Sequence, residues 1–360
     1  MKTAKYIELE ERYGAHNYHP LDIVIKKADG VWVEDVEGNR YIDFLAAYSA
    51  VNQGHCHPRI LKALRNQAKK CCLTSRAFRN DQLPFFCQEV CELTGFDRVL
   101  PMNTGAEAVE TAIKAARKWG EKVKGVAKDQ SEIIVCSDNF HGRTTTIVGF
   151  STDDQYKDGF GPFTPGFKTV PFGDAAALEQ AMTPHTVGFL VEPIQGEGGV
   201  MVPADDYLSS VRKLCDERDL LLIFDEVVTG FRLGMGGAQG YFGIKPDLTI
   251  FGKCVTGGYP MAGGVGGRRD VITTFAPGIG GTGERAYIGG TLSANPMSCV
   301  AGYQLISKVP ATLHTPLMSG ANATLTLSAI VNATGDYVNL AEVTAQNEDD
   351  VDSTPNNGVD

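Results

Sequence analysis

The sequence contains no apolar run long enough to span a membrane and no basic region of the kind that binds nucleic acid. A spanning helix needs about 18 or more consecutive apolar residues, and no stretch of this chain approaches that length. No signal peptide precedes the first charged residues. The net charge of −10 disfavours a nucleic-acid partner, because phosphate binding requires a basic surface. We therefore expect a cytoplasmic protein without membrane or nucleic-acid partners.

A regular framework of cysteine ligands is also missing. The nine cysteines are odd in number and follow no metal-binding or disulfide spacing, which predicts reduced thiols in a cytosolic protein. His55, Cys56 and His57 are close enough in sequence to suggest a metal site. Two imidazoles on one extended turn point apart, however, so we predict no metal there.

Lysine and arginine are absent after Lys308. Residues 309–360 carry seven acids and so hold most of the net negative charge: Asp336, Glu342, Glu348, Asp349, Asp350, Asp352 and Asp360. The alternation of apolar and polar residues over 323–329 predicts a strand, and residues 337–345 predict a second one. Gly335 and Asp336 favour a turn between them. Residues 309–360 are therefore expected to form an atypical, acidic and β-rich tail.

The rest of the composition is that of an ordinary globular protein. Of the 360 residues, 43% are hydrophobic and 21% are charged. The length allows two or three structural units.

Residues 220–258 combine two apolar runs with an acid and a lysine. The run 220–224 suits a strand buried on both faces of a parallel sheet. Asp225 follows at its carboxyl end, where open α/β sheets place their ligands. A second run, 248–251, leads to Lys253 in a glycine-lined turn. An acid and a lysine so placed suit pyridoxal 5′-phosphate, whose pyridine nitrogen needs a carboxylate and whose aldehyde forms a Schiff base with lysine. The alternative is a surface acid and a surface lysine on an α/β domain.

Other strands are expected to end at the same sheet edge. The apolar runs 133–136 and 187–191 predict buried strands, and Glu192 and Glu197 follow the second of them. A helix is expected over 205–218. Strands and helices that alternate in this way predict an α/β fold with a mostly parallel sheet.

A helix with small residues at its start is expected after residue 103. Asn103 or Thr104 can cap it, which leaves the backbone N–H groups of Gly105 and Ala106 free. A helix N-terminus of this kind can bind an anion, and the phosphate of the cofactor is the candidate. Small residues also begin many helices that bind nothing.

The amino-terminal residues predict a small β-rich segment. A polar lead-in is followed by alternating apolar strands, with Gly30 and Gly38 in the turns that connect them. A helix is expected to begin at Pro58, because proline suits the first helical position.

Residues 220–258 resemble the cofactor signature of the class III aminotransferases over some forty positions. The resemblance implies that Lys253 is the Schiff-base lysine and that Asp225 is the partner of the pyridine nitrogen. It also implies a fold-type I pyridoxal-phosphate-dependent transferase. Its parts would be an N-terminal segment (1–55), a cofactor-binding large domain (56–308) and a C-terminal domain truncated or replaced by residues 309–360.

Residues 48–58 and 73–78 resemble the ornithine aminotransferases within that family. The resemblance implies that Tyr48 contacts the substrate, that Phe140 stacks on the cofactor ring and that Arg143 binds a substrate carboxylate. The residue matching Glu197 pairs in that family with a C-terminal arginine and governs which substrate is admitted. Thr291 matches a threonine that reaches the cofactor phosphate of the neighbouring subunit, which implies a homodimer with shared sites. The expected cofactor contacts are completed by Thr104, Gly105, Ala106, His141, Glu192 and Val228, where Val228 stands in place of a glutamine.

Two other resemblances affect the expected activity. The sequence of residues 223–308 resembles glutamate-1-semialdehyde aminomutase more than ornithine aminotransferase. Residues 313–360 resemble the end of a β-sandwich repeat of bacterial surface proteins. Because residues 309–360 contain no arginine, the C-terminal arginine of the family has no counterpart. We therefore expect poor transamination by this chain.

The sequence supports one main hypothesis and three alternatives. The main one is transfer of the δ-amino group of ornithine to 2-oxoglutarate, which gives glutamate semialdehyde and glutamate. The alternatives are a glutamate-1-semialdehyde aminomutase or another ω-aminotransferase, an inactive cofactor-binding fusion, and a surface-protein fragment whose tail is the functional part.

Overall fold

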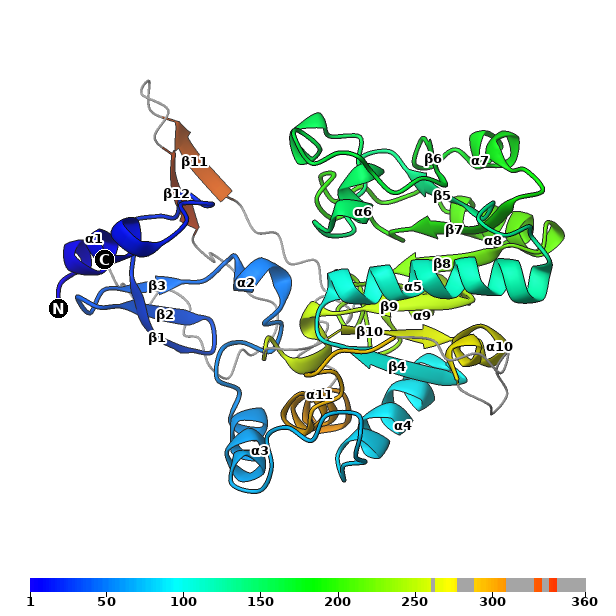
Figure 1. Ribbon diagram of the computed structural model, residues 1–360. Coiled ribbons are helices and arrows are strands. Elements are labelled where there is room, and N and C mark those ends of the chain that lie inside the picture. The colour runs from blue at the N-terminus through cyan, green and yellow to red at the C-terminus, as the bar shows by residue number, and fades with distance from the viewer. Residues whose placement is uncertain (260–262, 277–287, 309–326, 332–336, 342–360) are drawn as a thin grey trace. The chain divides into compact units, whose positions relative to one another are not determined.

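The computed structural model describes residues 1–259, 263–276, 288–308, 327–331 and 337–341 (Figure 1). The chain divides into two compact units, Met1–His314 and Thr315–Asp360. Within the described residues the second unit contains one antiparallel hairpin, β11 (Leu327–Val331) paired with β12 (Tyr337–Ala341). These strands overlap the two predicted for the tail at 323–329 and 337–345, whose residues 323–326 and 342–345 lie outside the described residues. The turn predicted at Gly335 and Asp336 lies outside the described residues.

The amino-terminal segment contains a helix and a small antiparallel sheet. The sheet has the order β1-β2-β3 (Ile25–Asp29, Trp32–Asp35 and Arg40–Ile42), as the turn glycines predicted. The helix α1 (Thr3–Tyr13) was missed, because the sequence predicted only a polar lead-in. Tyr6, Leu9 and Tyr13 lie at helical spacing, but charged residues separate them and none of the helix is buried, so the short pattern was not recognised as a helix.

The large sheet has seven strands in the order β4-β10-β9-β8-β7-β5-β6. Strands β9, β8, β7, β5 and β6 are parallel to one another, and β10 is antiparallel to both of its neighbours. The predicted mostly parallel sheet is confirmed. Its bounds are Arg98–Met102 (β4), Glu132–Cys136 (β5), Phe167–Val170 (β6), Thr186–Val191 (β7), Leu221–Asp225 (β8), Leu248–Phe251 (β9) and Gly263–Gly267 (β10).

Strand β10 consists almost entirely of glycine, which explains why the sequence did not predict it. A Cβ on Gly264 would lie 2.6 Å from the ring of Phe251, and one on Gly266 would lie 2.0 Å from the ring of Phe96. Two phenylalanine rings therefore occupy the space that β10 side chains would fill. Only glycine lets this strand pair between β4 and β9.

Helices cover both faces of the large sheet (Figure 1). Alternate residues of a strand point to opposite faces. Ile133 and Val135 of β5 accordingly pack with α5, whereas Ile134 and Cys136 pack with α7 and α8. The helices are α2 (Ala46–Ser49), α3 (Pro58–Ala68), α4 (Leu83–Thr94), α5 (Gly105–Trp119), α6 (Thr145–Gly149), α7 (Ala175–Ala181), α8 (Tyr207–Glu217), α9 (Gly237–Phe242), α10 (Arg269–Ile272) and α11 (Pro296–Lys308).

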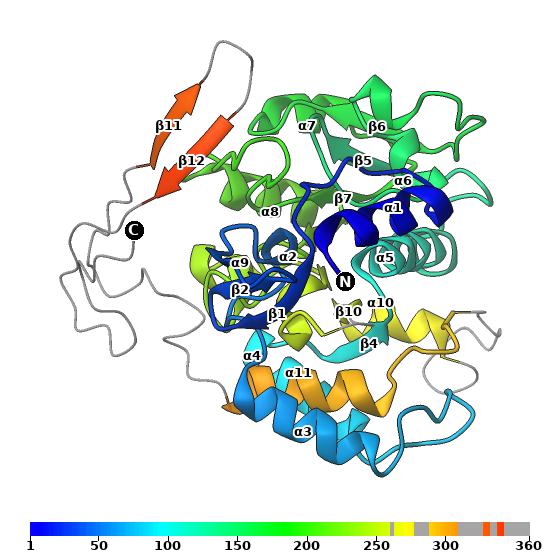
Figure 2. The same cartoon turned by 90° about the vertical axis from the view of Figure 1, so that its left-hand side faces the viewer.

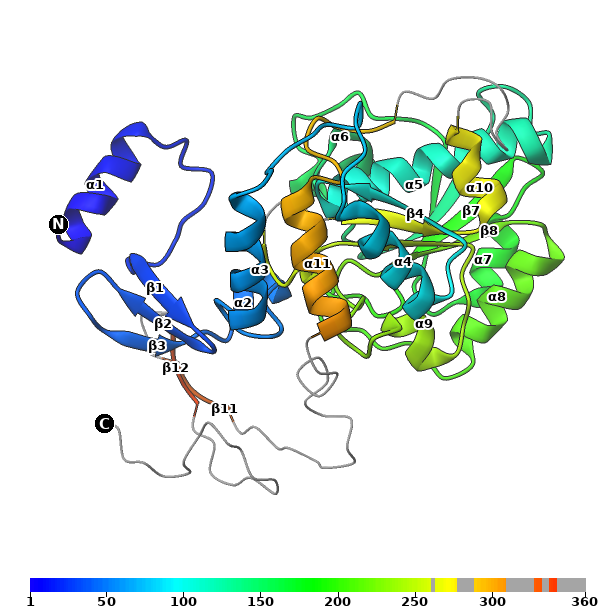
Figure 3. The same ribbon diagram turned by 90° about the horizontal axis from the view of Figure 1, so that it is seen from below.

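A second core joins three helices of the first unit. Helix α11 runs beside α3 (Figure 2) and beside α4 (Figure 3). Ile60 from α3, Val90 from α4 and Leu305 from α11 are fully buried there. Among the described helices, none is both long and apolar enough to cross a bilayer.

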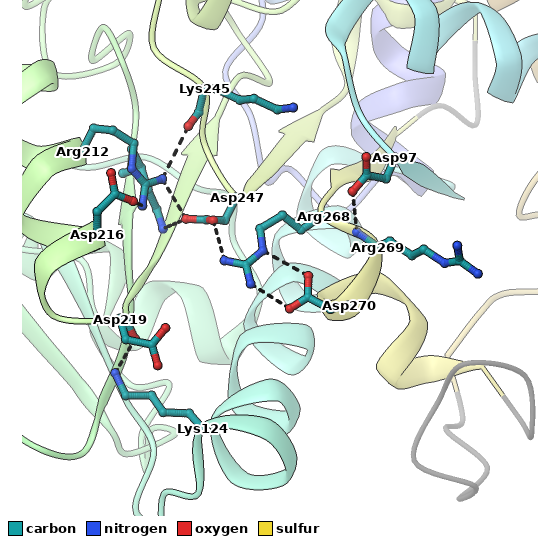
Figure 4. A network of polar contacts seen from close by, with 11 residues as sticks. Asp97, Lys124, Arg212, Asp216, Asp219, Lys245, Asp247, Arg268, Arg269 and Asp270 are labelled. Atoms are coloured by element: carbon teal, nitrogen blue, oxygen red, sulfur yellow. Dashed lines mark hydrogen bonds and ion pairs between the residues drawn. The ribbon is translucent and has the colours of Figure 1, made fainter.

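A buried carboxylate holds the amino ends of β8 and β9 together (Figure 4). Asp247 accepts hydrogen bonds from Arg212 at 2.7 Å, from Arg268 at 2.8 Å and from the backbone N–H of Leu222 at 2.8 Å. Burial disfavours the charge of Arg212, but Asp247 outweighs this effect and leaves the pKa of the guanidinium above its usual value.

Replacing Asp247 with alanine is expected to lower the free energy of unfolding by about 3 kcal/mol, because it leaves Arg212 and Arg268 without this partner. Chemical denaturation measures the change. The matched control is Asp154→Ala. Asp154 is almost fully exposed, and its one ion-pair partner among the described residues is Lys157, so its loss should have no measurable effect. Equal effects of the two substitutions would contradict a special role for the Asp247 network.

Candidate active site

The carboxyl ends of β5, β7 and β8 bring a buried acid and a buried histidine together. Asp225 is the last residue of β8 and is 4% exposed. One of its oxygens accepts a hydrogen bond from Nδ1 of His141 at 2.6 Å, and the other accepts from the N–H of Val227 at 2.9 Å. A carboxylate only accepts, so Nδ1 of His141 carries the proton. Nε2 of His141 is buried and has no partner among the described residues.

Asp225 affects the protonation of its histidine partner. Burial disfavours an imidazolium, but the hydrogen bond and the charge of Asp225 outweigh it, so the pKa of His141 is raised. A buried carboxylate at this sheet edge is also the group that a protonated ring nitrogen needs as a partner.

Glu192 connects two loops of the same edge. It follows β7, is 5% exposed, and accepts hydrogen bonds from the N–H of Phe140 at 3.0 Å and of Gly196 at 3.2 Å. Burial raises the pKa of this carboxyl. Glu192 therefore fixes the loop of Phe140 relative to the loop that leads to Glu197.

The N-terminus of α5 is capped as the sequence allowed, by Thr104. Its hydroxyl accepts from the N–H of Glu107 at 3.1 Å, and the Glu107 carboxylate accepts from the N–H of Asn103 at 2.9 Å. The pair resembles a capping box, except that the Glu107 carboxylate binds the N–H one residue before the cap. It leaves the N–H groups of Gly105 and Ala106 without hydrogen-bond partners in the described part of the chain. Two free N–H groups at a helix N-terminus can hold an anion.

Lys253 follows β9 within the short 3₁₀ turn Lys253–Thr256. The side chain is half-buried, and within the described ranges its amine makes neither a hydrogen bond nor an ion pair. The preceding Gly252 packs tightly on α5, since a Cβ there would lie 3.3 Å from Cα of Gly105. The lysine turn and the free N–H groups are therefore neighbours, although some 150 residues separate them in the sequence.

Phe140 and Arg143 lie on one loop. Phe140 is half-buried, with its ring edge-on to Tyr156 at 6.1 Å. The Arg143 guanidinium is exposed, lies 5.7 Å from the centroid of the Phe140 ring and donates to the hydroxyl of Tyr18 at 3.1 Å. An exposed guanidinium with only a neutral hydrogen-bond partner is available to a carboxylate.

The remaining predicted site residues lie at the surface or near it. Glu197 and Thr291 are exposed, and Val228 is half-buried beside Gly196, where a Cβ would lie 3.4 Å from a Val228 methyl carbon. His55, from the rejected metal motif, instead pairs with Asp43 at 2.7 Å.

Tyr48 is 63% exposed and lies in a left-handed stretch. The φ angles of Ala46, Ala47, Tyr48 and Ser49 are 46°, 50°, 54° and 69°. This conformation costs an L-residue about 1–2 kcal/mol, so a run of four needs support from contacts with other parts of the chain.

The comparisons with known proteins identify the family of the chain. The profile of the family "Aminotransferase class-III" matches residues 13–323. The chain belongs to the class III aminotransferases.

Individual relatives support the same assignment. The ornithine aminotransferase of Bordetella pertussis is 54% identical over 292 residues, which cover 81% of this chain and 69% of that protein. The solved structure of the ornithine aminotransferase from Toxoplasma gondii is 41% identical, with a TM-score of 0.80, and covers 85% of this chain and 71% of the other. The acetylornithine aminotransferase from Elizabethkingia anophelis is 47% identical, with a TM-score of 0.73, and the match covers 84% and 74% of the two chains.

Class III aminotransferases depend on pyridoxal phosphate, and the residues of this member fit that group. Gly105 and Ala106 offer free N–H groups to a phosphate, Asp225 offers a buried carboxylate to a pyridinium, and Lys253 offers an amine to an aldehyde. A Cβ on Gly105 would lie 3.0 Å from a Val227 methyl carbon, so glycine lets the start of α5 approach the residues that follow Asp225. The chain is thus a pyridoxal-phosphate-dependent aminotransferase of the fold-type I class.

Two further polar side chains lie near this aminotransferase site. The sequence placed Glu226 beside Asp225 at the end of the strand but did not predict its contacts, and it did not identify Arg232. Glu226 is 1% exposed and accepts from the N–H groups of Ala238 at 2.5 Å and Gln239 at 2.9 Å, and burial raises its pKa to about 7. It anchors the loop between β8 and α9. Arg232 lies in that loop and contacts residues on two other segments. Its contacts span about 180 residues of sequence, and no local pattern could have predicted them.

Proposed function

We propose that the chain transfers the δ-amino group of ornithine to 2-oxoglutarate and produces glutamate semialdehyde and glutamate. The observation that carries the chemistry is the buried Asp225–His141 pair at 2.6 Å at the end of β8. The neighbouring strand β9 leads to Lys253, a half-buried lysine whose amine has no partner among the described residues. The preference for ornithine rests on the 54% identity to a protein named ornithine aminotransferase. The resemblance of residues 48–58 and 73–78 to that family also supports it.

Each site residue has a role that follows from its chemistry. When bound, pyridoxal phosphate supplies the aldehyde that takes up the amino group and a protonated ring that draws electrons. Asp225 holds the proton on the ring nitrogen. The N–H groups of Gly105 and Ala106 bind the phosphate, and Phe140 covers the ring face. Lys253 accepts and returns a proton at Nζ.

Substrate recognition falls to residues around this centre. We assign Arg143 to the substrate carboxylate, because its guanidinium is exposed and can bind a carboxylate in a bidentate manner. Tyr48 is assigned to the amine substrate and Glu197 to the choice between substrates. Thr104, His141, Glu192 and Val228 are assigned to cofactor positioning.

We further propose a cytoplasmic homodimer in which Thr291 reaches the site of the neighbouring subunit. Fourteen of the 24 exposed large apolar side chains in the described residues belong to residues 1–48. An apolar surface of this kind favours contact with another protein surface, and a second copy is the occupant we propose. All nine cysteines are free, as a reducing compartment requires. A monomeric mass in light scattering would contradict the dimer.

The substrate is tested by mixing the purified holoenzyme with one amine at a time and recording its visible absorbance. Ornithine should bleach the cofactor band, and 2-oxoglutarate should restore it. N-acetylornithine is the matched comparison, because one of the similar solved structures is named acetylornithine aminotransferase. Faster bleaching by N-acetylornithine would contradict the proposed substrate. A band that neither amine bleaches would indicate cofactor binding without activity. The steady-state rate with ornithine also tests the expected effect of the missing tail arginine.

A further inference from the structure

Arg232 joins the lysine turn to the segment that carries Tyr48. Its Nη2 donates to the carbonyl oxygen of Ser49 and lies 3.2 Å from Sγ of Cys254, the residue after Lys253. The thiol of Cys254 donates to the same Ser49 carbonyl at 3.1 Å. The Ser49 carbonyl is therefore held by two donors that both belong to the site.

The partners of Arg232 show what it does. Its Nε donates to the carbonyl of Val228 at 2.9 Å, so its acceptors are two carbonyls and a thiol. No carboxylate pairs with it in the part of the chain that the structure describes. A half-buried guanidinium that binds backbone carbonyls fixes the course of the chain and does not balance a charge.

A second contact also joins the lysine turn to the segment that carries Tyr48. Nε2 of Gln53 donates to the carbonyl of Gly257 at 2.7 Å. Gly257 and Gly258 have φ angles of +64° and +76°, and a Cβ on them would lie 2.7 Å from Nε2 of Gln53 and 2.8 Å from a methyl carbon of Val51. The lysine turn therefore packs directly on residues 51–53, and glycine is required at both positions.

The left-handed stretch Ala46–Ser49 leads into these contacts. The N–H of Ser49 donates to Leu45 at 3.2 Å, and the N–H groups of Ala50 and Val51 donate to Ala46 at 2.8 and 3.2 Å. L-residues disfavour this conformation, so contacts from outside the stretch must maintain it. The Asp43 carboxylate supplies one at the start, where it accepts from the N–H of Ala46 at 2.9 Å. Arg232 supplies one at the end, on the residue next to Tyr48.

We propose that Arg232 is a positioning residue that fixes Tyr48 relative to Lys253 and so sets the affinity for the amine substrate. The proposal rests on the proposed function for the roles of Tyr48 and Lys253. The guanidinium holds the Ser49 carbonyl against Cys254, and loss of this contact frees the Tyr48 segment while the cofactor contacts of α5 and β8 persist.

The first test is hydrogen–deuterium exchange on the full chain, which does not depend on activity. In Arg232→Met, amide exchange in residues 46–54 should rise by at least about tenfold, the effect of losing one charge-assisted hydrogen bond, while exchange in β8 stays unchanged. Arg232→Lys, which can still donate to Ser49, should show a smaller rise. The control is Arg218→Met, since Arg218 pairs with Glu179 at the surface. Unchanged exchange in residues 46–54 would overturn the proposal.

A second variant, which keeps Arg232, tests the proposal even if Arg232→Met does not fold. Gln53→Leu removes the contact to Gly257 and a longer one to the carbonyl of Gly54 at 3.3 Å, and should raise exchange in residues 51–54. If Arg232→Met unfolds, this variant and Arg232→Lys decide the question. Wild-type exchange over residues 46–54 in both would show that neither contact holds the segment.

The second test is kinetic. Arg232→Met should raise KM for ornithine by about tenfold or more and leave KM for 2-oxoglutarate and the visible cofactor band unchanged. Tyr48→Phe should have little further effect in the Arg232→Met background, because the first substitution already displaces Tyr48. Fully additive effects would show that Arg232 does not act through Tyr48. A wild-type protein that fails to turn over ornithine contradicts the proposed function alone, and the exchange experiment still tests the role of Arg232.

Discussion

Lys253→Ala should abolish transamination and leave the fold intact. The amine is unpaired in the described part of the structure, so its removal leaves no buried charge without a partner. The substitution removes both the covalent attachment of the cofactor and the group that moves the proton, which should lower kcat by at least about 10⁴-fold. A steady-state assay with ornithine and 2-oxoglutarate measures the rate, and thermal denaturation checks the fold.

A labelling experiment tests the assignment of this lysine directly. Borohydride reduction of the holoenzyme should attach the cofactor permanently to Lys253, which peptide mapping detects. The matched control is Lys245→Ala, because Lys245 is exposed and lies in the loop before β9, whereas Lys253 follows β9. This control should keep the label on Lys253. Label on a different lysine would show that the assignment is wrong.

Local sequence patterns predicted much of the large domain. The apolar runs at 220–224 and 248–251 became β8 and β9, and the small residues after Thr104 became the start of α5. These predictions succeeded because a buried parallel strand is apolar on both faces and a helix cap is a local hydrogen bond. Helix α1 and strand β10 were missed for opposite reasons. The helix has no buried face, and the strand has glycine where neighbouring rings fill the space.

The sequence named candidate site residues but could not predict the contacts between them. Asp225 and His141 were both named, yet nothing local indicates that their side chains meet, because 84 residues separate them. The same holds for Glu192, which binds the N–H of Phe140 across 52 residues. Such contacts depend on the order of the strands, since β5, β7 and β8 are neighbours in the sheet. A resemblance can name positions, but the hydrogen bonds between them require the fold.

The second large effect on the rate is expected from a substitution in the Asp225–His141 pair. Asp225→Asn keeps the size of the side chain and removes the charge that holds a proton on the pyridine nitrogen. It also removes the charge that raises the pKa of His141. We expect kcat to fall by about 10³-fold, which corresponds to about 4 kcal/mol of barrier. The cofactor should still bind through Lys253 and the N–H groups of Gly105 and Ala106.

Two controls separate this electronic effect from a structural one. Asp219→Asn changes an exposed acid just before β8 and should leave the rate unchanged. His141→Gln keeps the Asp225 carboxylate and should cost less than Asp225→Asn, because the charge beside the ring nitrogen remains. Cofactor absorbance confirms that each variant is loaded before its rate is measured. If Asp225→Asn turns over ornithine at close to the wild-type rate, the partner of the ring nitrogen is a different carboxylate. Glu192, which is buried at the same edge and close enough to interact electrostatically with both Asp225 and His141, would then be the residue to replace.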